Sequence, residues 1–458
     1  MAEETRYLVL DSRIIADVED AKLTLGEVSK HPENPLFTED KPWEPRYDNV
    51  YPDVIYDEDE KIYKCWYNPF VVDARVTSTP PERRHPDLIK YNDVKPTDRE
   101  IGLCYAVSTD GIHWEKPELG LAEFEGGTSN NIVTRRRGVA GIYKDDRDPD
   151  PARRYKMFFS ASRGAFVAFA PDGLHWDELI PVPGHEGGNR PSALWSPHLG
   201  KYVVITRRNS DLGRRQVTQT ESCDFVTWRR ERSIMEGPTA QLQTHDMIVF
   251  PTCGVYIGLV GVMTFPEEDS DRGVKQHAEL AWSPDTVTWH RIQEGTPFIG
   301  HSPAEHERFG ETPYDWGTIF AVAPIFHDDE VRIYYGAGDW HFFEWRNGYL
   351  ALATLRLDGW AGYAPISPQS TAVITTELLD FDGETLGVTA DVDDGGSVQV
   401  EVEDAANARL AASQPITDTV TDGKVEWKTD ESLGSLSGKW ARLRFRLQKA
   451  KLYGFQIR

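Results

Sequence analysis

Short runs that alternate apolar and polar residues fill most of the chain, and no long run follows the 3.6-residue period of a helix. The most regular run is a strand of apolar and aromatic residues that ends in a turn similar to Ser-x-Asp-Gly-x-x-Trp. It occurs five times, in residues 101–114, 165–176, 216–228, 278–289 and 348–360. This repetition predicts one structural unit that is built five times.

The turns end on Trp114, Trp176, Trp228, Trp289 and Trp360, which are 62, 52, 61 and 71 residues apart. Each spacing has room for four strands with long loops, the content of one propeller blade. A second apolar strand precedes each turn strand, in residues 61–67, 153–159, 201–207, 255–261 and 331–337. A third set, which begins at Asn49, Gly138, Pro191, Asp246 and Gly317, is expected to form the innermost strands.

We therefore predict an all-β protein, with a five-bladed β-propeller in residues 46–365 and a C-terminal β-sandwich in residues 366–458. The boundary between propeller and sandwich follows from a change in the residue pattern after Pro365, where Asp, Gly, Thr and Val begin to alternate. Residues 1–45 are expected to pack on the propeller or close its seam, with strands at 7–15 and 23–28. The repeated Asp and Trp residues of the turns are interpreted as structural.

The charge excludes two classes of partner. The formal net charge is -24, and no basic stretch is long enough to follow a phosphate backbone, so we expect neither a nucleic-acid partner nor a membrane partner. Of the 50 basic residues only 17 are Lys. With the abundant Asp, this pattern fits either a salt-adapted surface or an ordinary acidic mesophilic protein.

Cysteine usage and the N-terminus indicate the compartment. Cys65, Cys104, Cys223 and Cys253 show no CxxC spacing and are interpreted as buried free thiols. Residues 1–15 lack the apolar core of a signal peptide, and no stretch is apolar enough to cross a bilayer. The chain as it stands is expected to be cytoplasmic, although a signal peptide removed during export would leave the same sequence.

Polar residues at the entrances of the inner strands are the candidates for a functional site, because these strands converge on the propeller axis. The catalytic candidates are the carboxylates Asp48, Asp53, Asp246, Asp315 and Glu311. The candidates for substrate binding are Arg137, Asn189, Arg190, His245, Trp316, Trp340 and His341. Asp53 precedes Tyr63, and Asp246 precedes Tyr256, by the same ten residues. We therefore expect Asp53 and Asp246 to point into one axial pocket.

Paired carboxyls suit the cleavage of a glycosidic bond, which needs one protonated carboxyl and one ionised carboxyl. Asp48 or Asp53 is expected to act as nucleophile or base, with Asp246, Glu311 or Asp315 as the acid. An arginine such as Arg190 would keep one member of the pair ionised. The competing interpretation is structural, with each carboxylate accepting hydrogen bonds from the backbone of a neighbouring blade.

Neither a catalytic metal nor a cofactor is indicated. His245 and His341 could ligate a metal together with Asp246, but the three lack a short-range ligand motif. A structural calcium or sodium ion in the axial channel is compatible with the carboxylates.

The order of elements resembles that of glycoside hydrolase families 32, 43 and 68, which are five-bladed propellers acting mainly on furanosides. Residues 62–69, IYKCWYNP, are similar to an aromatic strand that follows the nucleophile segment in family 32. Residues 34–37, Trp43 and residues 101–111 resemble the mannoside phosphorylases of family 130. The chain departs from both patterns, because it has no Glu-Cys pair and its Arg147-Asp148-Pro149 follows an inner strand instead of preceding it.

The resemblance implies a glycoside hydrolase that takes an oligosaccharide or glycoside, for example a fructoside or arabinofuranoside. A glycoside phosphorylase is the first alternative, and would need arginines such as Arg137, Arg190, Arg207 and Arg208 around a phosphate. A non-catalytic sugar-binding propeller is the second. The sugar, the linkage, the stereochemical outcome and the oligomeric state stay open at this point.

Overall fold

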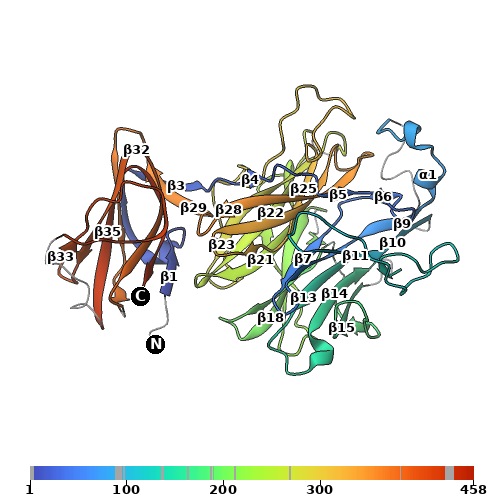
Figure 1. Cartoon of the computed structure of the whole chain (residues 1–458), viewed down its shortest axis with the longest axis horizontal. Coiled ribbons are helices and arrows are strands. Elements are labelled where there is room, and N and C mark those ends of the chain that lie inside the picture. Colours follow the sequence, from blue (N-terminus) through green and yellow to red (C-terminus); the bar gives the residue numbers. More distant parts are fainter. Residues whose placement is uncertain are drawn as a thin grey trace.

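The computed structural model describes residues 5–87, 95, 98–135, 139–161, 164–185, 188, 190–210, 213–267, 270–381, 383–428 and 438–458. These residues form a propeller of five blades and a smaller β domain that contains the C-terminus (Figure 1). The predicted fold class is confirmed. None of the helices in these ranges has the length and apolar character needed to cross a membrane.

Each blade begins with an inner strand and continues outward through antiparallel neighbours. Blade one contains β7 (Asp53–Asp57), β8 (Ile62–Tyr67), β11 (Leu103–Ser108) and β12 (Ile132–Thr134). Blade two contains β13 (Val139–Lys144), β14 (Tyr155–Ala161), β15 (Gly164–Ala170) and β16 (Ile180–Val182). Blade three contains β17 (Ser192–Ser196), β18 (Lys201–Asn209), β19 (Arg215–Ser222) and β20 (Arg232–Glu236).

Blades four and five are joined into one larger sheet. Blade four contains β21 (Leu242–Thr252), β22 (Val255–Thr264), β23 (Lys275–Ser283) and β24 (His290–Arg291). Blade five contains β25 (Thr318–Ala321), β26 (Ile325–Phe326), β27 (Glu330–Gly338) and β28 (Gly348–Arg356). Its outer edge is completed by β4 (Ser29–Lys30) and β5 (Phe37–Thr38), which pair with β28. The N-terminal segment thus closes the propeller seam.

A small sheet and short helices lie beside blade one. The sheet contains β6 (Arg46–Tyr47), β9 (Pro69–Asp73) and β10 (Arg99–Ile101), and β9 leads into α1 (Ala74–Thr77). The 3-10 helices of the described residues include η1 (Ser12–Ile14), η2 (Pro81–Arg83) and η5 (Pro151–Arg153). Asp73 caps α1 by accepting a hydrogen bond from the Val76 N–H at 3.1 Å.

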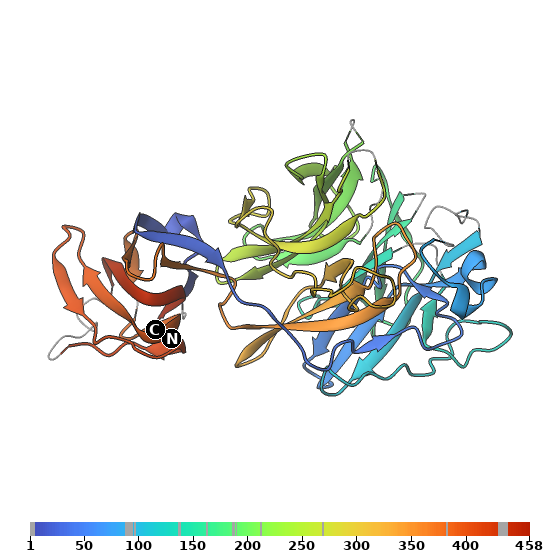
Figure 2. The ribbon, with the colours of Figure 1, turned by 90° about the horizontal axis from the view of Figure 1, so that it is seen from above.

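The C-terminal domain is one curled sheet around its own core, and Figure 2 shows it at one end of the molecule. Its strands are β1 (Thr5–Leu8), β2 (Ile15–Glu19), β3 (Ala21–Leu25), β29 (Ala361–Pro365), β30 (Thr371–Thr376), β31 (Leu379–Phe381), β32 (Leu386–Glu403), β33 (Arg409–Ala412), β34 (Val420–Lys424) and β35 (Lys439–Ile457). The register of β32 against β35 shifts between Val392 and Ser397. Three N-terminal strands therefore belong to this sheet, and the chain then crosses to the propeller.

The repeated turn owes its sequence signature to local hydrogen bonds. The Asp110 carboxylate accepts from the backbone N–H groups of Ile112 and His113, both at 2.8 Å. Equivalent bonds are made by Asp172, Asp224 and Asp285. These Asp residues therefore shape the turns, as the sequence indicated. Cys223 lies in one such turn and is exposed, so the prediction of a buried thiol is wrong there.

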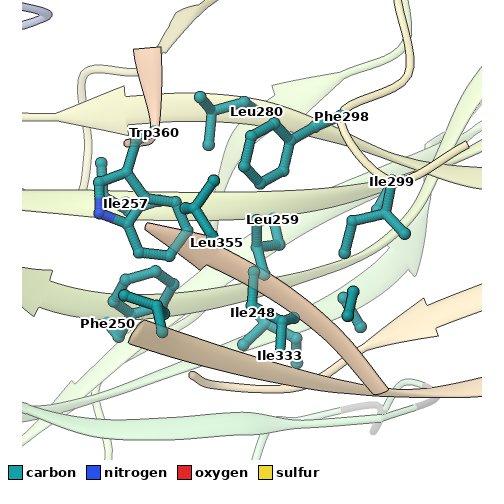
Figure 3. Close-up of a cluster of buried hydrophobic side chains, with 14 of the residues drawn as sticks. Ile248, Phe250, Ile257, Leu259, Leu280, Phe298, Ile299, Ile333, Leu355 and Trp360 are labelled. Carbon is teal, nitrogen blue, oxygen red and sulfur yellow. The ribbon is translucent and has the colours of Figure 1, made fainter. Parts of the chain in front are cut away.

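Large apolar side chains fill the space between neighbouring blades. The cluster between blades four and five includes Ile248, Phe250, Ile257, Leu259, Leu280, Phe298, Ile299, Ile333, Leu355 and Trp360 (Figure 3). Trp360 is 1% exposed and packs 5.2 Å from Phe250 between ring centroids. Because packed blades hold their inner strands rigidly, polar side chains at the axis have fixed positions.

Candidate functional site

Arg190 connects two blades that are not neighbours in the ring. It precedes β17 in blade three, and its Nη2 lies 3.5 Å from the carbonyl oxygen of Pro52, which precedes β7 in blade one. Its Nη1 donates to Asp246 Oδ2 in blade four at 2.9 Å. The side chains of Arg190 and Asp246 are both buried. The contact between blades one and three places this guanidinium at the axis, against Asp246, and its charge also acts on Asp53.

Asp246 is held as an ionised carboxylate. Gln276 Nε2 donates to its Oδ1 at 3.2 Å, and His245 Nδ1 lies 3.5 Å from the same oxygen. Burial by itself would raise the pKa of Asp246, but the contact with His245 and the charge of Arg190 outweigh burial and lower the pKa below its ordinary 3.8. Gly261 allows this geometry, because a Cβ there would lie 1.9 Å from Asp246 Oδ1.

Asp53 is shifted in the opposite direction. Burial raises the pKa of its carboxyl from 3.8 to about 7, although the charge of Arg190 and the Ile142 N–H act against this rise. The Ile142 N–H donates to Asp53 Oδ2 at 3.2 Å. The two carboxyls beside Arg190 therefore differ in protonation near neutral pH, where Asp53 can hold a proton and Asp246 cannot.

Positive charge gathers on the blade-three side of this cluster. Burial lowers the pKa of His245 to about 4, and the charges of Arg207 and Arg215 act in the same direction. Burial and the charge of Arg207 lower the pKa of Arg215 to about 10. The neutral imidazole of His245 thus lies within the field of two arginines, Arg207 and Arg215, and Arg190 contacts the neighbouring Asp246. Such a group of cations favours an anion or a developing negative charge.

Asp48 lies beside this cluster, between two buried arginines. Arg346 Nη2 donates to Asp48 Oδ1 at 2.8 Å, and Arg46 Nη2 lies 3.5 Å from the same oxygen. Arg346 also donates to the Asn49 side-chain oxygen, and the Asn49 amide donates to the Tyr51 hydroxyl. These contacts link Asp48 to Tyr51, over whose ring the Arg190 guanidinium lies at 5.9 Å.

Two of the predicted carboxylates, Asp315 and Glu311, have partners away from the axial cluster. Asp315 is fully buried, and its Oδ2 lies 2.5 Å from Lys30 Nζ and accepts from the Tyr335 hydroxyl at 3.1 Å. This ion pair joins β4 to blade five. Glu311 is exposed and pairs with Arg308 at 2.9 Å. Their contacts assign Asp315 to the propeller seam and Glu311 to the surface.

The predicted aromatic residues form a separate packed group. Trp316 is 3% exposed and stacks on Trp340 at 4.9 Å between ring centroids, and Lys275 Nζ lies 3.2 Å from the Trp316 centroid. Trp340 Nε1 donates to Glu344 at 2.8 Å, and His341 Nδ1 lies 3.5 Å from the same carboxylate. With Trp340 and Lys275 against it, buried Trp316 has a packing role.

Two predicted binding residues, Arg137 and Asn189, lie outside the described residues. Sequence reasoning missed Gln276 and Arg346, which contact Asp246 and Asp48. Strand β23 reads KQHAELAWS, and Gln276 is one of several polar residues in it, so the sequence did not single out the first. The loop around Arg346 contains no sequence signal that points to this residue.

Several buried polar atoms around Asp246 lack a hydrogen-bond partner within the described part of the chain. They are Arg190 Nε, Gln276 Oε1 and Thr318 Oγ1. Similar atoms occur elsewhere in the described residues, for example Nε1 of Trp114 and Trp176, so these three do not by themselves mark a ligand site. No three His, Cys, Asp or Glu side chains in the described ranges are grouped to hold a metal ion.

No family model matches the sequence, and no curated protein matches it. A solved structure of β-1,2-mannobiose phosphorylase from Listeria innocua is 15% identical, covers 72% of this chain and 97% of that chain, and has a TM-score of 0.49. An N-acetylgalactosamine deacetylase from F. plautii is 13% identical, over 73% and 96%, with a TM-score of 0.49. A fructofuranosidase from Schwanniomyces occidentalis is 9% identical, over 92% and 96%, with a TM-score of 0.43. At such identities the likeness concerns the fold, and the activity has to be argued from the residues of this chain.

Proposed function

We propose that this protein is a carbohydrate-active enzyme that cleaves a glycosidic bond at the axial cluster of Asp53, Arg190 and Asp246. One observation carries the proposal. Arg190 contacts Asp246 at 2.9 Å and its charge also acts on Asp53, and the pKa values of the two carboxyls are shifted in opposite directions, to about 7 by burial for Asp53 and below the ordinary value for Asp246 through His245 and Arg190. Glycoside cleavage needs this division into an acid and an ionised carboxylate.

In the proposed reaction Asp53 donates its proton to the leaving oxygen as the glycosidic bond breaks. Asp246 carries the negative charge that stabilises the positive anomeric centre, either by attacking it or by activating water. Arg190 keeps Asp246 ionised and fixes its position. This division of roles is the reverse of the one expected from the sequence, where Asp53 was a candidate base and Asp246 a candidate acid.

The substrate to test first is a furanoside, such as a fructoside or an arabinofuranoside, on the basis of the resemblance to families 32 and 43. A panel of aryl furanosides, aryl pyranosides and oligosaccharides should contain a compound that the wild type cleaves. On that compound D53N and D246N should each lose at least about two orders of magnitude in kcat, and E311Q, an exposed carboxylate, should lose none. If both axial variants keep near-full activity, the proposed site is wrong.

Phosphorolysis is the second candidate, and the positive charge of Arg207 and Arg215 beside His245, with Arg190 on the adjacent Asp246, favours it. Inorganic phosphate would then replace water and take the glycosyl group as a sugar 1-phosphate. Turnover should depend on phosphate, and R215Q should raise the KM for phosphate more than the KM for the sugar. Equal rates with and without phosphate would leave hydrolysis as the activity.

A further inference from the structure

A cleft lies beside blade one, lined by residues other than Asp53, Arg190 and Asp246. The cleft has a volume of about 870 Å³. One wall is the segment around β5, a second is the region of β9 and α1, and a third is the end of the loop between β27 and β28. Its lining includes Glu39, Arg84, Phe124, Phe309, Trp345 and Tyr349. A cavity of this size can enclose a small ligand of several rings.

The lining combines aromatic surface with balanced charge. Phe124, Phe309, Trp345 and Tyr349 are aromatic, and three basic side chains face three acidic ones, namely Lys41, Arg84 and Arg135 against Glu39, Glu44 and Glu125. Three of the six are already paired elsewhere, Lys41 with Asp40 at 3.8 Å, Glu44 with Lys116 at 2.7 Å and Arg135 with Glu100 at 2.8 Å. This mixture suits a neutral ligand that has both apolar faces and hydroxyl groups, and it disfavours a highly charged one.

The wall of the cleft is shared with the residues that hold Asp48. Glu44 and Pro45 line the cleft, and the next residue, Arg46, lies over the Trp345 ring at 5.3 Å and 3.5 Å from Asp48. On the other side Trp345 and Asn347 line the cleft, and Arg346 between them donates to Asp48. The cleft therefore adjoins the outer part of the axial cluster.

We infer that this cleft binds the distal sugar rings of a neutral oligosaccharide whose reacting bond lies at the axial cluster. The inference rests on the proposed function and deepens it, because it makes the substrate a neutral chain of several sugars. Phe124 and Phe309 are the side chains to test, since both are half-buried and lie in loops outside the strands of the blades. Trp345 is buried against Arg46 and is unsuitable.

Binding is measured without turnover, by native affinity electrophoresis in gels that contain arabinan, inulin, mannan or polygalacturonate. At least one neutral polysaccharide should retard the wild type, and polygalacturonate should not. F124A and F309A should each weaken the retardation about tenfold in apparent Kd, as expected for loss of one stacking ring. W440A is the control, because Trp440 is 61% exposed on the C-terminal domain. Unchanged thermal midpoints verify that the variants fold.

The outcomes separate this inference from the proposed function. Retardation that is lost in F124A and F309A supports the cleft, even if no compound of the panel is cleaved. If the wild type cleaves oligosaccharides, both variants should raise the KM for them and leave kcat on aryl monosaccharides unchanged. The cleft is overturned if both variants keep wild-type retardation and KM, if only W440A loses retardation, or if no neutral polysaccharide retards the wild type.

Discussion

The guanidinium of Arg190 lies 2.9 Å from the carboxylate of Asp246, and both side chains are buried although they come from different blades. Removing one charge from such a pair leaves the other in a region that water does not reach. The D246N variant should therefore be less stable by about 3–5 kcal/mol, measured by urea unfolding. The double variant R190M/D246L should regain much of this stability without regaining activity. Wild-type stability in D246N would contradict the buried pair.

The D53N variant separates a general acid from a carboxylate that only binds substrate. Because the acid protonates the leaving oxygen, its loss matters most when that oxygen is basic. We expect a loss of about 10²–10⁴ in kcat on alkyl glycosides or oligosaccharides, and a smaller loss on 4-nitrophenyl glycosides. An equal loss on both kinds of substrate would count against Asp53 as the acid.

The pH dependence of activity and stability should carry the signature of Asp53. Burial raises its pKa to about 7, so kcat/KM should fall above about pH 7 as the acid loses its proton, and this alkaline limb should disappear in D53N.

The folded state binds the Asp53 proton more tightly than the unfolded state. Its contribution to the free energy of unfolding is therefore complete below about pH 4 and is lost as pH rises through 7. Unfolding of the wild type and D53N across this range tests the sign.

Asp315 should influence stability and leave catalysis unchanged. It pairs with Lys30 at 2.5 Å and holds β4 against blade five, so K30M leaves a fully buried carboxylate without its cation. We expect K30M to lower the free energy of unfolding by about 3–5 kcal/mol and D315N to lower it less. The kcat of both should stay within about twofold of wild type. A large drop in kcat for D315N, with unchanged stability, would return Asp315 to the catalytic candidates.

Salt should raise the thermal midpoint, because a net charge of -24 repels itself and added ions screen the repulsion. The rise should be steepest below about 0.5 M, where the screening length changes most. Potassium chloride and tetramethylammonium chloride should act alike if screening is the cause. A midpoint that is flat or falls up to molar potassium chloride would remove the salt-adapted interpretation.

The five-bladed propeller could be predicted from the sequence because its defining contacts are local. Asp110, Asp172, Asp224 and Asp285 each accept hydrogen bonds from the backbone N–H groups two and three residues ahead. The same turn therefore requires a similar sequence in each of these blades. The strands before each turn follow from alternation for the same reason, since neighbouring strands are joined by short connections. Blade phase also suggested Asp53 and Asp246 as a pair, and their shared axial pocket stays a prediction.

Only the tertiary structure decided which carboxylates share a partner. Arg190 contacts Asp246 and the Pro52 carbonyl because the ring of blades closes, and no local spacing in the sequence specifies the distance between non-adjacent blades. The same holds for Lys30, whose distant strand determines that Asp315 is a structural residue, and for the N-terminal strands that join the C-terminal sheet. The pKa values of Asp53 and Asp246 depend on burial and on these partners, so the division into acid and ionised carboxylate required the packed structure.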